Sequence, residues 1–259
     1  MINARQEIIL KDLISDYIET ARPVASSRLV DNFGISVSPA TVRNDMVDLE
    51  YQGYLEKPHI SGGRIPTTKG YHYYVSNLLD GDNETSHEEE VIEKEVEKFS
   101  RTFDGFLLRL GELISDITSE MSIMGFSDRD IHHFGMSRIL SQPEFTDIHK
   151  TQELALLIDS LSKFHNQLTK KALEKLSEFS IADEEKKTLV FIGHMPFFQE
   201  KEIDCSVVLG RYFGPQGRQG IVGILGPRRM KYSRNKSLVA FVSRLISGTV
   251  AIFIVTIII

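Results

Sequence analysis

Apolar side chains recur at three- and four-residue steps through the N-terminal segment. The recurring positions are Ile9, Leu10, Leu13, Ile14, Tyr17 and Ile18. This spacing predicts an amphipathic helix over Asn3–Thr20. Pro23 and the small residues after it break the pattern. A short second helix is then predicted at 26–32, with Ser26 as its N-cap and Gly34 closing it in the left-handed conformation.

A third helix is predicted from Ser38, which can act as the N-cap, with Pro39 at the first helical position. It runs to about Gln52 and ends at Gly53. Three helices joined by short turns predict a helix-turn-helix unit. Two short extended stretches within 54–67, around a Ser-Gly-Gly turn, then predict a β-hairpin, which is the wing of such a unit.

Another helix is predicted to follow the wing, with Thr67 as its cap and a polar linker after it. Beyond the linker, apolar residues are spaced alternately four and three apart, which is typical of two helices packed along their length. This seam comprises Ile92, Val96, Phe99, Phe103, Phe106, Leu110, Leu113 and Ile117. It is a candidate for part of a dimer interface. Packing within the chain against a second helical pattern, which contains Leu154, Leu157 and Leu161, is the alternative.

Short β-rich runs punctuated by glycine and proline follow toward the C-terminus. They cover residues 188–192, 205–209 and 221–225. A helix is predicted at 236–247. The last stretch, 249–259, is apolar and β-branched, and even counted from Leu245 it is shorter than the roughly 20 residues that span a bilayer. We therefore expect a buried terminal strand without membrane attachment, because an exposed strand of this composition would aggregate.

The net charge of −6 is unevenly divided, with −2 over residues 1–80, −12 over 81–185 and +8 over 186–259. Because the chain is not basic overall, any contact with nucleic acid must use locally placed cations. The single cysteine, Cys205, excludes an intrachain disulfide and suggests no zinc site, so neither a metal nor a cofactor is expected. The charged N-terminal residues differ from a secretory signal, which favours the cytoplasm.

The third predicted helix carries residues that suit DNA recognition. Val42, Met46 and Leu49 share the face that would pack on the other helices, so the opposite side is exposed. The exposed candidates are Ser38, Ala40, Thr41, Arg43, Asn44, Val47 and Tyr51. In the major groove Asn can bond adenine, Arg can bond guanine, and Ala or Thr can meet a thymine methyl group. Base reading is therefore assigned to Arg43 and Asn44.

Phosphate contacts are expected beside these bases. Ser38 and the free N–H groups at the start of the third helix can take a phosphate. In the wing, Lys57, His59 and Arg64 are candidate contacts to phosphates or to the adjacent minor groove. A solvated surface without DNA contact is the alternative, above all for Lys57 and His59.

Two groups of motifs stand out at the two ends of the chain. The first group is RQEI at 5–8, DYIET at 16–20, PV at 23–24, SPATVRNDM at 38–46 and GGRIPTTKGY at 62–71. The second group is QPEF at 142–145, DCSVV at 204–208 and GILGPRRMKYSR at 223–234. Together they resemble the HrcA family of heat-inducible transcription repressors. The resemblance covers nearly all of the chain except about 80–140 and the last ten residues.

This resemblance implies a homodimer that occupies an inverted-repeat DNA operator upstream of chaperone operons and represses them until heat stress. It implies a chaperonin partner that keeps the repressor active, and a GAF-type sensory domain with an inserted dimerisation domain. The segment before Gln142 is shorter than in the family. We therefore expect the inserted domain and part of the GAF-like sheet to be reduced or absent.

The expected fold class is α+β. The expected order is a winged helix-turn-helix at 1–79, a linker at 80–87, a helical and dimerising region at 88–180, and a small GAF-like α/β domain at 181–259. The expected function is repression of heat-shock genes. The alternative is a winged-helix regulator of other genes that responds to a ligand or partner through its C-terminal domain.

Two further interpretations compete with this one. An enzyme would have to use His132, His133 and His194 with Asp128 and Asp130, but these residues lack metal-ligand spacing and no nucleophile motif accompanies them. We therefore expect no enzymatic activity. The basic run at 226–234 is typical of a second nucleic-acid site, or else of a solvated turn before the last predicted helix.

Overall fold

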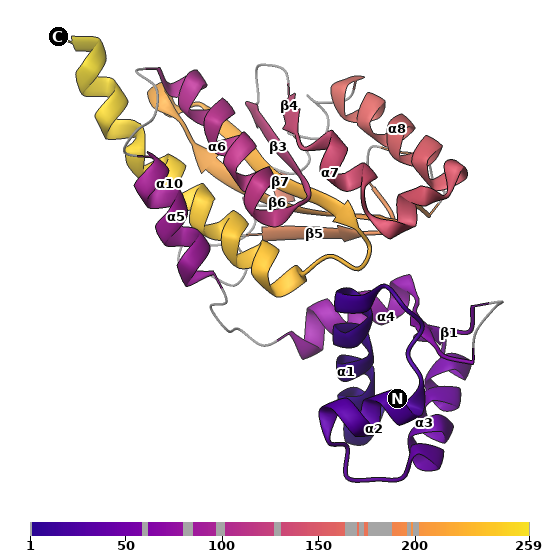
Figure 1. Ribbon diagram of the computed structural model, residues 1–259. Coiled ribbons are helices and arrows are strands. Elements are labelled where there is room, and N and C mark those ends of the chain that lie inside the picture. Colours follow the sequence, from indigo (N-terminus) through magenta and orange to yellow (C-terminus); the bar gives the residue numbers. More distant parts are fainter. Residues whose placement is uncertain are drawn as a thin grey trace. The chain divides into compact units, whose positions relative to one another are not determined.

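The computed structural model describes residues 2–58, 62–79, 85–96, 102–126, 131–163, 170, 174–175, 188–195, 198 and 202–258. The chain forms two compact units. The first contains Met1–Gly81 together with the short segment Arg228–Lys231, and the second contains Asp82–Pro227 and Tyr232–Ile259. The elements of each unit are labelled in Figure 1, and each unit is described by itself.

The first unit begins with three helices, α1 (Ala4–Thr20), α2 (Ser26–Phe33) and α3 (Pro39–Tyr51). The side chain of Asn3 caps α1 through the Gln6 N–H, at 2.9 Å, in a reciprocal capping box. Gly34 closes α2 in the left-handed conformation, with φ 66°, as predicted. The prediction that Ser26 caps α2 is wrong, because Ala25 is the N-cap and makes no side-chain cap bond, while Ser26 is already helical.

The apolar faces of these helices form one core. Its fully buried members are Ile9, Leu10, Leu13, Ile14, Val24, Leu29, Val42, Leu49 and Leu55. Both the three- and four-residue spacing of α1 and the predicted inner face of α3 are confirmed by this burial.

The wing consists of β1 (Leu55–Glu56) and β2 (Ile65–Pro66), which pair antiparallel as predicted. An isolated bridge between Val24 and Arg64 ties the returning strand to the turn before α2. The hydroxyl of Thr67 then caps α4 (Thr68–Tyr73) by accepting from the Gly70 N–H at 3.1 Å. A π-helical turn, η1 (Tyr74–Leu78), continues α4.

The second unit is built on an antiparallel sheet of five strands in the order β4-β3-β7-β6-β5. The strands are β3 (Met121–Phe126), β4 (Ile131–Phe134), β5 (Thr188–Ile192), β6 (Cys205–Phe213) and β7 (Gln219–Pro227). The three predicted β-rich runs are the cores of β5, β6 and β7. The prediction of a helical region through 88–180 overlooked β3 and β4. It failed because β3 is buried on both faces and lacks an alternating pattern.

Helices cover both faces of this sheet (Figure 1). The helical elements of the unit are α5 (Ser86–Val96), α6 (Phe103–Thr118), α7 (Met136–Leu140), η2 (Pro143–Thr146), α8 (Ile148–Lys163), η4 (Pro215–Gly217) and α10 (Tyr232–Ile258). On one face, Ile123 and Val207 belong to the same buried cluster as Leu157 of α8. On the other face, the Ser122 hydroxyl donates to the Gly111 carbonyl of α6 at 2.6 Å. The unit is therefore a helix–sheet–helix sandwich.

Part of the predicted dimer seam lies inside this sandwich, whereas Val96, Leu113 and Ile117 are half-buried. Phe106 and Leu110 of α6 are 1% and 0% exposed, and α6 packs on β3 and β4. The assignment of these side chains to a dimer interface is therefore wrong, because they are already covered within the chain. The alternative prediction, that the seam packs within the chain against the helix carrying Leu157, is also wrong. That helix packs on the opposite face of the sheet. Phe99 lies outside the described residues.

The C-terminal stretch is helical, and the prediction of a terminal strand is wrong. α10 runs from Tyr232 to Ile258 without interruption. The upstream part of α10 supplies a nucleus, and each further residue adds a hydrogen bond to it, so propagation overrides the strand preference of the β-branched residues. None of the helices in the described parts of the chain is both long enough and apolar enough to cross a membrane.

Candidate nucleic-acid interface

The recognition helix α3 exposes the face that the sequence predicts. Its inward residues Val42 and Leu49 are fully buried, whereas Val47 and Tyr51 are 45% and 93% exposed. Ser38, Ala40, Arg43 and Asn44 are also exposed, and Thr41 is half-buried. Val47 and Tyr51 both lie on the side of the helix that carries the candidate base-reading groups, Arg43 and Asn44.

The start of α3 is fixed by a side-chain cap. The Ser38 hydroxyl accepts from the Thr41 N–H at 3.2 Å and lies 2.9 Å from the Thr41 hydroxyl. Pro39 at the first helical position needs no N–H partner. This N-terminus is a positive dipole end beside the exposed face, and it can meet a phosphate.

Two of the three carboxylates on α3 are paired with arginines from other elements. Asp45 is buried and accepts two hydrogen bonds from Arg5 of α1, at 2.7 and 3.1 Å. The hydrogen bond and the charge of Asp45 raise the pKa of Arg5. Glu50 accepts from Nε of Arg64 at 2.7 Å. The third carboxylate, Asp48, is exposed and has no side-chain partner within the described part of the chain. These pairings reduce the negative charge near the exposed face.

The wing supplies fewer free cations than predicted. Lys57 is exposed, as a phosphate contact requires, and His59 lies outside the described residues. Arg64 differs, because its side chain is 12% exposed and is bonded to Glu50 and to the carbonyls of Gly62 and Gly63. The structure thus places Lys57 beside solvent and Arg64 in an intramolecular network.

Further long-range contacts hold the helices of the first unit in position, and sequence reasoning missed all of them. Arg28 donates to both oxygens of Asp16, at 2.9 and 2.7 Å, and this bond raises the pKa of Arg28. The Tyr73 hydroxyl donates to Glu7 at 2.6 Å, which raises the pKa of Tyr73. Arg28 and Asp16 are 12 positions apart in the sequence, and Tyr73 and Glu7 are 66 positions apart. A helical pattern within one segment therefore cannot show them.

The basic run at 226–234 has partners within the chain. In the first unit, Arg228 donates to the Thr68 hydroxyl at 2.6 Å and Arg229 to the Ile18 carbonyl at 3.0 Å. In the second unit, Arg234 of α10 pairs with Glu88 of α5 at 3.0 Å. These bonds favour a structural role for the run over a second nucleic-acid site.

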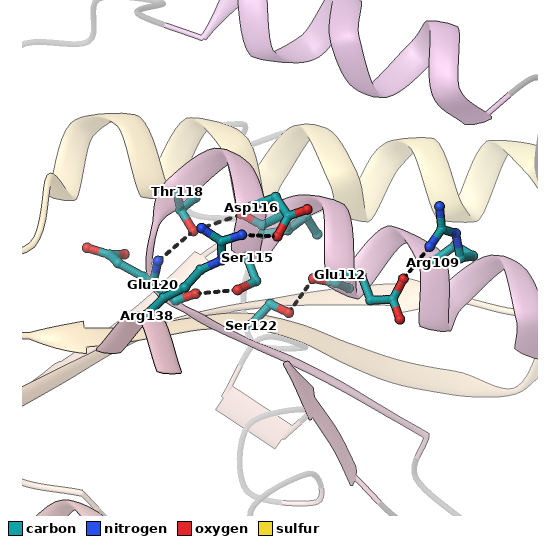
Figure 2. Close-up of polar contacts among 10 residues, drawn as sticks. Arg109, Glu112, Ser115, Asp116, Thr118, Glu120, Ser122 and Arg138 are labelled. Carbon is teal, nitrogen blue, oxygen red and sulfur yellow. Dashed lines mark hydrogen bonds and ion pairs between the residues drawn. The ribbon is translucent and has the colours of Figure 1, made fainter. Parts of the chain in front are cut away.

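Polar groups of the second unit are also used internally. Ser115 donates to the Glu120 carbonyl at 2.8 Å, and Arg138 of α7 pairs with Asp116 of α6 at 2.5 Å. Figure 2 shows both contacts. These contacts tie the end of α6 to the start of β3 and to α7. Of the residues considered for an enzyme, His132 and His194 are exposed, His133 is half-buried, and Asp128 and Asp130 lie outside the described residues. The part of the chain that the structure describes contains no group of three metal-ligating side chains.

A winged helix-turn-helix with an exposed recognition helix defines a DNA-binding regulator. A family profile described as winged helix-turn-helix transcription repressor, HrcA DNA-binding, matches residues 1–78, and one described as HrcA protein C terminal domain matches residues 73–235. The chain belongs to the HrcA family of winged-helix transcription repressors, which are not enzymes. The predicted family and the α+β class are confirmed.

Relatives extend this match over 95% of the chain. The heat-inducible transcription repressor HrcA of Carboxydothermus hydrogenoformans is 28% identical over 334 aligned positions, covering 95% of this chain and 98% of the relative. The protein of the same name from Desulforudis audaxviator is 26% identical, covering 95% and 97%. Because these alignments are longer than 259 residues, the relatives carry positions with no counterpart here.

A solved structure supports the fold alone. A crystal structure described as a hypothetical protein at 2.2 Å resolution matches with a TM-score of 0.70 and 20% identity, covering 98% of this chain and all of that one.

Proposed function

We propose that this protein represses heat-shock chaperone genes by binding an inverted-repeat operator as a homodimer. The observation that carries the proposal is the exposed face of α3, where Arg43 and Asn44 stand beside Val47 and Tyr51 at the surface. Family membership and the relatives' name, heat-inducible transcription repressor, support the choice of genes.

The roles of the individual residues follow from their chemistry. Arg43 and Asn44 read base edges in the major groove, since guanidinium and amide groups bond guanine and adenine bidentately. Ala40, Thr41, Val47 and Tyr51 complete the apolar and hydroxyl contacts to that groove. Ser38, Lys57 and His59 take phosphates or the adjacent minor groove.

Dimerisation is part of the proposal because one helix-turn-helix contacts too few base pairs to specify a single genomic site. A palindromic operator also requires a protein with two-fold symmetry. We assign the first 79 residues to DNA binding and the region beyond residue 87 to dimerisation and sensing, with a chaperonin as the partner that maintains repression. Because the proposed operator lies on the chromosome, we also propose that the protein is cytoplasmic.

The decisive test compares variants on two duplexes. One duplex is enriched by the wild-type protein from a random-sequence pool, and the other is an unselected duplex of the same length. Asn44→Ala and Arg43→Ala should each reduce the binding free energy by about 1–3 kcal/mol on the enriched duplex and by much less on the unselected one. Lys57→Ala should weaken both similarly and flatten the dependence on salt. Equal losses on both duplexes for Asn44→Ala would refute base reading.

Chromatin immunoprecipitation before and after a temperature shift tests the regulon. Occupancy at chaperone promoters that falls on heating supports the proposal. Occupancy confined to other promoters would instead indicate a winged-helix regulator of other genes.

A further inference from the structure

Arg64 links three parts of the DNA-binding unit at one point. Its Nε donates to Glu50 of α3 at 2.7 Å, and its Nη1 donates to the Gly62 and Gly63 carbonyls at 3.4 and 3.3 Å. Its backbone exchanges two hydrogen bonds with Val24, both 2.9 Å long. The recognition helix, the wing and the turn before α2 therefore meet at this residue.

The same region is closed by two neighbouring contacts at the end of α3. The Thr67 hydroxyl donates to the Gly53 carbonyl at 2.7 Å, and Lys69 Nζ donates to the Gln52 carbonyl at 2.7 Å. These bonds hold the backbone after α3 against the start of α4, which follows the wing. The guanidinium of Arg64, in contrast, bonds to a side chain on α3 itself.

A phosphate would have to compete with these partners for Arg64. The Arg64 side chain is 12% exposed, and the Glu50 carboxylate opposite it is 33% exposed. Turning the guanidinium toward DNA would break a charge-assisted bond and leave a partly covered carboxylate without its cation, which is unfavourable. The contacts favour retention of the pair when DNA binds.

We propose that Glu50 and Arg64 set the position of the wing against the recognition helix, so that Arg64 is a positioning residue for DNA binding and not a phosphate ligand. This inference rests on the proposed function, because it assigns the pair a role in the same DNA complex. The pair acts on DNA through Lys57 and the other wing residues, whose distance from the groove it determines.

The two roles predict opposite effects for E50Q. If the pair positions the wing, E50Q weakens binding to the enriched duplex about tenfold, although it removes a negative charge that DNA repels. R64Q weakens binding equally, and the double variant is no weaker than either single variant. R64K also weakens binding, because lysine keeps the charge but cannot bond the carboxylate and the carbonyls together.

D48N is the matched control, since it makes the same charge change on the same helix at an exposed carboxylate with no partner in the described residues. It should bind as tightly as the wild-type protein or more tightly. Hydroxyl-radical footprinting should show E50Q losing protection of the DNA backbone beside the wing while protection beside α3 persists, an outcome that a general loss of stability would not produce. Circular dichroism verifies that each variant is folded.

Several outcomes would overturn the inference. Unchanged or tighter binding by E50Q, with R64Q weaker and R64K close to wild type, would make Arg64 a phosphate ligand. Strictly additive losses in the double variant would exclude a joint role. Failure of the wild-type protein to enrich any duplex would refute the proposed function itself, and the positioning role with it.

Discussion

Gly63 lies where the wing touches the turn before α2, and an alanine there should displace the wing. A Cβ atom added at Gly63 would lie 2.8 Å from the Pro23 carbonyl carbon, 2.9 Å from its oxygen and 2.9 Å from the Val24 nitrogen. All three are backbone atoms, so no side chain can rotate away. The strand would have to move by about 0.6 Å to reach ordinary contact at 3.4 Å.

That displacement acts on the two hydrogen bonds of the Val24–Arg64 bridge, each 2.9 Å long. Lengthening them by the same amount takes them beyond the normal range for N–H···O bonds. At about 0.5–1.5 kcal/mol each, their loss should lower the free energy of unfolding by about 1–3 kcal/mol. Gly63→Ala should also weaken operator binding, because the wing carries Lys57.

Gly62→Ala is the matched control, since a Cβ atom at Gly62 has nothing within 4 Å. It should be neutral or slightly stabilising, because alanine reduces the entropy of the unfolded chain. Urea denaturation gives the stability difference, and hydrogen exchange at the Val24 and Arg64 amides reports the bridge directly. If Gly63→Ala matched Gly62→Ala in stability, exchange and DNA affinity, the close approach would have no energetic role.

Three other perturbations have defined outcomes. Leu157→Ala should cost about 2–5 kcal/mol in urea denaturation, whereas Leu156→Ala, at a site 51% exposed, should change stability by less than about 0.5 kcal/mol. Burial raises the pKa of Asp12 above its usual 3.8, although Lys11 opposes the shift. Asp12→Asn should therefore stabilise the protein at neutral pH, and denaturation at several pH values should show this gain vanishing below pH 3.8. Leu110→Glu should abolish cooperative unfolding, while Leu108→Glu, at a site 37% exposed, should stay folded. If the wild-type protein were a dimer and Leu110→Glu a folded monomer, Leu110 would instead belong to the dimer interface.

The local elements of the DNA-binding unit could be predicted because their signals act over a few residues. Ser38 and Thr67 cap their helices through N–H groups three positions away, and Gly34 ends α2 with a positive φ. The inner face of α3 follows from the helical period alone. For the same reason the exposed face, with Arg43 and Asn44, was accessible to sequence reasoning.

The second unit was predicted less completely because its order depends on partners distant in sequence. β3 pairs with β7, which lies about 100 positions later in the sequence. Because β3 carries buried residues on both faces, its sequence shows no alternation of apolar and polar residues. The seam on α6 has the spacing of an interhelical contact. That spacing identifies a buried face without showing whether a sheet, a helix or a second chain covers it.

The contrast between Asn44 and Arg64 shows where this limit falls within the winged helix-turn-helix unit. Exposure of Asn44 is decided by its position on one helix, whose inward residues are apolar. Whether Arg64 is available to bind a phosphate depends on Glu50, 14 positions away on another element, and on the two carbonyls that accept from its guanidinium. A cation in a glycine-rich turn is therefore equally compatible, in sequence, with holding a phosphate and with holding a carboxylate. Only the fold supplies the carboxylate, and it thereby changes the expected sign of a mutation at Glu50.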